Sequence, residues 1–91
     1  MAQESNKGII PTWPRDSDVA RIDELVRDLG EGDRSPNAMI REHLEAARFY
    51  LLGSMPSEYQ FNLELAEGLV SDLDDQDLQG RIREFVRSQR Q

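Results

Sequence analysis

The length, composition and charge of this chain exclude several kinds of protein. It has 91 residues, 37% of them hydrophobic, no cysteine and a formal net charge of −7. The lack of cysteine excludes disulfide bonds, thiolate metal sites and cysteine nucleophiles, and the negative charge argues against direct binding to DNA or RNA, because phosphate contacts need clustered cations. No stretch of about 20 apolar residues would cross a membrane, and none near the N-terminus is long enough for a signal peptide. We therefore expect a cytoplasmic protein that binds neither membrane nor nucleic acid.

The chain begins with a segment that shows no helical or strand period. Residues 1–14 are predicted to form an irregular arm, because one glycine and two prolines interrupt them. Residues 15–91 are predicted to form a single helical-bundle domain. Its first helix is expected over residues 16–29, where apolar side chains recur at helical spacing, and Gly30 follows as a terminator.

The second helix is predicted over residues 36–52. Ser35 and Pro36 have the residue types expected at the N-cap and at the first helical position. Gly53 follows the apolar stripe and is expected to end the helix.

The third helix, predicted over residues 57–73, has an ambiguous pattern. Ser57 and Gln60 have the spacing of a capping box. Residues 59–65 also alternate between apolar and polar types, which is a strand signal. A helix is favoured because no second apolar run is available to pair with a lone strand. Gly68 weakens this helix and marks either a kink or a close helix crossing.

The fourth helix is expected over residues 75–88, capped by Asp74 or Asp75. Four short helices with tight connections predict an all-α fold, a compact bundle of four short helices with the irregular N-terminal arm. The core is expected to contain Ile22, Val26, Leu29, Ile40, Leu44, Leu51, Leu63, Val70, Leu78, Ile82 and Phe85.

No motif in the chain indicates catalysis, a cofactor or a metal. The single histidine, His43, lies beside the apolar stripe of the second helix and is interpreted as a boundary residue, with ligand binding or pH sensing as the alternative. A calcium loop that begins at Asp75 would need a glutamate at its twelfth position, where Val86 stands. The acidic residues there are better explained as helix caps, and we expect neither an enzyme nor a bound metal.

Some bulky apolar residues lie outside the helical faces that are predicted to form the core, and they form a candidate partner-binding site. Phe49, Leu52 and Phe61 lie away from the faces that the four-helix core requires, and Trp13 of the arm is a candidate neighbour. Contiguous exposed apolar groups usually mark an interface. The alternative is that the arm or the fourth helix covers them and completes the core.

Acidic residues are concentrated in the third predicted helix and the connection that follows it. From Glu58 to Asp77 there are seven acidic residues and no basic one. We expect Glu58 and Glu64 to contribute to a polar rim that attracts a basic partner. The alternative is a solvated face together with favourable helix-dipole interactions.

The predicted function is that of a non-enzymatic protein–protein interaction module, a small regulator or adaptor. It would bind a partner protein, or itself as a homodimer, through the surface of the second and third helices. One alternative is an acidic, antitoxin-like inhibitor that occupies a basic nucleic-acid-binding groove of another protein. Another is an accessory subunit of an enzyme complex.

Overall fold

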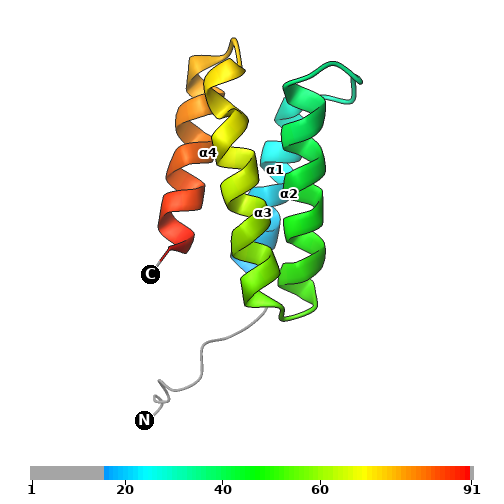
Figure 1. The fold of residues 1–91 in the computed structure, drawn as a ribbon, viewed down its shortest axis with the longest axis vertical. Coiled ribbons are helices and arrows are strands. Elements are labelled where there is room, and N and C mark those ends of the chain that lie inside the picture. Colours follow the sequence, from blue (N-terminus) through cyan, green and yellow to red (C-terminus); the bar gives the residue numbers. More distant parts are fainter. Residues whose placement is uncertain (1–15, 91) are drawn as a thin grey trace.

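The computed structural model describes residues 16–90, which form four α-helices joined by short connections (Figure 1). Successive helices run in opposite directions, and α2 and α3 form the closest pair. The predicted all-α four-helix fold is confirmed. The elements in chain order are α1 (Asp16–Leu29), α2 (Asn37–Leu52), α3 (Pro56–Leu69), the 3₁₀ turn η1 (Val70–Asp72) and α4 (Gln76–Gln89).

The helix ends follow the prediction closely except at the end of α3. The α-helix stops at Leu69, and the chain tightens into η1 where the prediction continued the helix to residue 73. Leu73 is already extended, with φ −72° and ψ 142°, and leads into the start of α4. Such 3₁₀ turns are common at helix ends. Residues 59–65 lie wholly inside α3, so the helical interpretation of the alternating pattern is correct.

Three of the five predicted helix-end arrangements are confirmed, those of Gly30, Gly53 and Asp75. Gly30 adopts φ +86° after α1, the left-handed conformation that glycine accepts without strain. Asp75 is the N-cap of α4, and its Oδ1 accepts a hydrogen bond of 3.1 Å from the backbone N–H of Leu78. The predicted Ser35 and Ser57 caps are wrong. Both α2 and α3 begin without a side-chain cap, α2 after Pro36 and α3 with Pro56 in its first turn.

Gly53 ends α2 as predicted, and the left-handed residue of the α2–α3 turn is the next one along the chain. Gly53 follows α2 with an ordinary φ of −86°, and Ser54 takes the left-handed conformation with φ 57°. The N–H of Met55 donates to the carbonyl of Tyr50 at 2.9 Å, and the N–H of Ser54 donates to that of Leu51 at 3.1 Å. This pair of bonds is a Schellman motif, which closes the helix and reverses the chain.

One apolar core holds the four helices together. All eleven residues predicted for the core are buried except Val26, which is half-buried and packs against it. Gly68 has open space where a Cβ would lie, so it does not mark a close helix crossing. Additional buried members of the core are Leu25, Ala47, Tyr59, Ala66, Leu73 and Val86.

A buried polar network joins helices that are distant in sequence. The hydroxyl of Tyr59 in α3 donates to Gln89 Oε1 at 2.8 Å, and Gln89 Nε2 donates to Asp18 Oδ1 in α1 at 3.2 Å. Because buried polar groups are costly unless hydrogen-bonded, this chain of contacts specifies how the ends of α1, α3 and α4 meet.

Surface ion pairs join neighbouring helices. Arg48 of α2 contacts Asp23 of α1, and Arg81 of α4 contacts Asp28 of α1, each at 2.7 Å. The hydrogen bond with Asp28 raises the pKa of the Arg81 guanidinium above its ordinary value. These pairs show which flank of each helix faces which neighbour, although exposed pairs add little to stability.

Candidate partner-binding surface

Phe49 and Phe61 point directly away from the core. Phe49 lies two residues from the buried Ala47 and two from the buried Leu51, and residues two apart on a helix are about 200° apart around its axis. Phe61 lies in the same way between buried Tyr59 and Leu63. The structure leaves Phe49 69% exposed and Phe61 61% exposed, so neither α4 nor any other described segment covers them.

The two phenylalanines stand at a similar level of the α2–α3 hairpin. Phe49 lies three residues before the end of α2, and Phe61 lies five residues after the start of α3. Packed helices have axes about 8–10 Å apart. Two outward aromatic side chains at this spacing are close enough for one partner to contact both.

Apolar residues continue between the two phenylalanines and along the hairpin. On α2, Arg48 contacts α1, and Tyr50, two residues later, therefore lies on the opposite flank, toward α3. On α3, Glu67 contacts Arg90 of α4, so Leu69 lies on the flank toward α2. Tyr50 and Leu69 are both half-buried and pack against the core.

We call the resulting outer surface of α2 and α3 the hairpin face. Met39 and Leu65, 45% and 38% exposed, extend it along the helices, and the ring of Phe49 meets that of Tyr50 edge to face with centroids 5.4 Å apart. Sequence patterns identified the phenylalanines, but Met39 and Leu65 were not predicted as site residues. The hairpin face comprises Met39, Phe49, Tyr50, Phe61, Leu65 and Leu69.

Leu52 lies at the margin of this surface, on the side of α2 toward α1. Leu52 is 47% exposed, but it follows Arg48 by one helical turn and so shares the flank of α2 that faces α1. The structure therefore does not bring Leu52 beside Phe61. Trp13 lies outside the described residues.

The charges near the hairpin face are acidic. Glu42, Glu58 and Glu64 are exposed on the outer sides of α2 and α3, and α3 contains no basic residue. The two arginines of α2 turn away, because Arg48 contacts Asp23 of α1 and Arg41 donates to carbonyl oxygens of the α1–α2 connection at 2.7 and 2.9 Å. Glu58 and Glu64 are thus exposed near Phe61, and the two basic side chains of residues 37–69 point elsewhere. An open hollow of about 250 Å³ lies beside Phe61, lined by Ser57 and Glu58.

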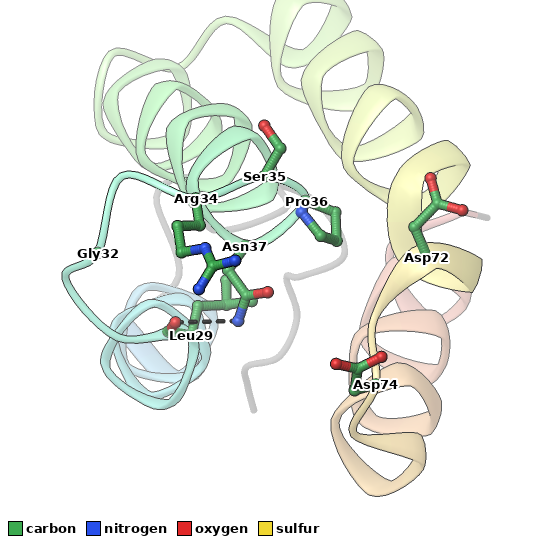
Figure 2. Close-up of a pocket in the computed structure, with 8 residues that line it drawn as sticks. All are labelled: Leu29, Gly32, Arg34, Ser35, Pro36, Asn37, Asp72 and Asp74. Atoms are coloured by element: carbon green, nitrogen blue, oxygen red, sulfur yellow. Dashed lines mark hydrogen bonds between the residues drawn. The ribbon is translucent and has the colours of Figure 1, made fainter.

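A second cavity lies at the opposite end of the bundle, between the α1–α2 and α3–α4 connections (Figure 2). It measures about 380 Å³, and Figure 2 shows Arg34 on one wall with Asp72 and Asp74 across from it. The amide of Asn37 bridges to the carbonyl of Leu29 at 3.2 Å and fixes the first wall. Because its walls are polar and carry both signs of charge, this cavity favours no particular class of ligand.

Two further ligand sites were open alternatives from the sequence, His43 and a calcium loop that begins at Asp75. His43 is half-buried on the flank of α2 toward α3, as the boundary interpretation predicts. The calcium-loop alternative fails because residues 76–86 are helical. Within the described range, no three His, Cys, Asp or Glu side chains gather to hold a metal, and no helix has the length and apolar character to cross a membrane.

Comparisons with protein-family models, with curated proteins and with solved structures give no match to this chain.

Proposed function

We propose that this protein is a non-enzymatic interaction module, a small regulator or adaptor that binds a protein through the hairpin face. The observation that supports the proposal is the outward orientation of Phe49 and Phe61 on adjacent helices. Aromatic side chains are favoured interface anchors, because each buries a large area while losing little rotational freedom. Their exposure in a chain with an otherwise well-formed core is best explained by a partner.

The test compares Phe49→Gln/Phe61→Gln with Leu52→Gln in the full chain. Glutamine preserves helix propensity, and Leu52 is an exposed apolar residue at the margin of the hairpin face, on the side of α2 toward α1, so it serves as the control for a peripheral apolar loss. Quantitative affinity capture and sedimentation are measured for each variant, with circular dichroism to verify folding.

We expect the double variant to stay folded and to lose a partner, or a dimer, that the wild type and Leu52→Gln share. A collapse of its melting temperature would show that the phenylalanines belong to the core of the full chain. An unchanged set of captured proteins and an unchanged mass in a folded double variant would also contradict the proposal.

A second candidate function is that of an acidic inhibitor that occupies a basic nucleic-acid-binding groove of another protein. It is favoured by the acidic run between Glu58 and Asp77, where six of the seven acidic side chains are exposed. Binding of this kind weakens steeply with salt, whereas apolar docking tolerates it. Replacing Asp72, Asp74 and Asp77 with Asn should abolish this activity and leave binding at the hairpin face intact.

A further inference from the structure

We infer that the occupant of the hairpin face is a basic amphipathic helix of a partner protein, lying along α2 and α3 with its apolar stripe on Phe49 and Phe61. This inference rests on the proposed function and adds the chemistry and secondary structure of the partner.

The dimensions of the apolar surface suit a short helix. Met39 and Phe49 are ten residues apart on α2, which corresponds to about 15 Å along the axis. A partner helix of about three turns covers this length. Its apolar side chains, repeating at three and four residues, would pack against the two phenylalanines and Leu65.

The charges around the surface select a cationic partner. Glu42 lies on the outer side of α2, while Glu58 and Glu64 border Phe61 on α3, and all three are exposed. The basic side chains of residues 37–69 are Arg41 and Arg48, and both are turned toward α1. Lysine and arginine of a docked helix would therefore meet carboxylates, and no cation of residues 37–69 faces the same surface.

The same charges disfavour a second copy of this chain. A symmetric dimer places the same patch of each protomer against its equivalent. Two hairpin faces would bring two sets of Glu42, Glu58 and Glu64 together without an intervening cation, in protomers that each carry a net charge of −7. Such like-charge contacts oppose association.

A helical partner is favoured over an extended one. Residues 16–90 contain no β-strand, so an extended peptide would find no sheet edge in this part of the chain with which to pair its backbone. A helix satisfies its own backbone hydrogen bonds and leaves only side chains to dock.

The inference is tested with three synthetic peptides of about 16 residues, a length that gives more than four helical turns. The first has Leu and Trp at helical spacing and Lys or Arg elsewhere. The second has the same composition in scrambled order, and the third carries Glu in place of the basic residues. Fluorescence anisotropy of each labelled peptide is measured against the full 91-residue chain. We expect the patterned basic peptide to bind at least tenfold more tightly than either control.

Two pairs of protein variants locate the binding. Phe49→Gln/Phe61→Gln should weaken binding of the patterned peptide at least tenfold, while Leu52→Gln should change its affinity less than about twofold. Glu42→Gln/Glu58→Gln should weaken it about threefold to tenfold at low salt and much less at high salt. The control Glu24→Gln/Glu84→Gln removes two exposed charges from α1 and α4 and should have little effect.

Several outcomes would overturn the inference. Failure of the patterned peptide to bind, equal binding of the scrambled or acidic peptide, or equal effects of the two glutamate pairs would each do so. If the wild type forms a dimer that the phenylalanine variant loses, the inference fails but the proposed function stands, with a second copy as the occupant. If peptide binding, dimerisation and protein capture are all insensitive to Phe49 and Phe61, the proposed function fails as well.

Discussion

Replacement of Ser54 by glycine should stabilise the protein, because the α2–α3 turn places a non-glycine residue in the left-handed conformation. Ser54 has φ 57° and is exposed, so the substitution removes no buried contact. The left-handed region costs an L-residue about 1–2 kcal/mol, and glycine loses about 0.5–1 kcal/mol more conformational entropy on folding than a residue with a side chain. The net gain is about 0.5–1 kcal/mol, which corresponds to about 2–8 °C in melting temperature for a domain of this size.

The assay is thermal and urea unfolding followed by circular dichroism, with Gly53→Ala as the matched control. Gly53 has φ −86°, and an added Cβ would lie 3.4 Å from the carbonyl oxygen of Phe49, so alanine should be tolerated there with little change. The reasoning would be refuted if Ser54→Gly destabilises the protein. It would also fail if Gly53→Ala costs more than about 1 kcal/mol, since glycine would then carry the left-handed conformation.

Three further substitutions test the core, a helix interior and the buried network. Leu44→Ala should lower the free energy of unfolding in urea by about 2–5 kcal/mol, because Leu44 is 0% exposed. A loss below about 0.5 kcal/mol would show that the face of α2 containing Leu44 is not the buried one. Gly68→Ala should raise stability by about 0.5–1 kcal/mol, because the added Cβ meets open space; a decrease would reveal a close contact at that position. Tyr59→Phe should cost about 1–2 kcal/mol, because Gln89 loses the hydroxyl donor at 2.8 Å, and an unchanged urea midpoint would show that the hydrogen bond contributes nothing.

The helices and the core could be predicted from the sequence because both depend on local periodicity. Ile40, Leu44 and Leu51 share a stripe only if the chain is helical, and all three are buried. The outward direction of Phe49 follows from the same arithmetic, since buried residues stand two positions away on each side.

Features that depend on the arrangement of helices could not be predicted in this way. Leu52 was grouped with Phe61, yet the flank on which it lies depends on which neighbour contacts that side of α2. The hydrogen bond between Asp18 and Gln89 joins residues 71 positions apart, and no local sequence pattern predicts it. The wrong caps at Ser35 and Ser57 have a different cause, because a cap depends on the backbone angles at one residue and several nearby residue types compete for the role.

The most direct test of the central claim is a chemical-shift map of the isotope-labelled full chain titrated with the patterned basic peptide. The account predicts that the largest changes fall on the hairpin face, at Met39, Phe49, Phe61 and Leu65, and that α1 and α4 change little. Changes centred instead on the acidic end of the bundle around Asp72 and Asp74, or spread evenly over all four helices, would contradict the claim that α2 and α3 form a specific partner-binding surface.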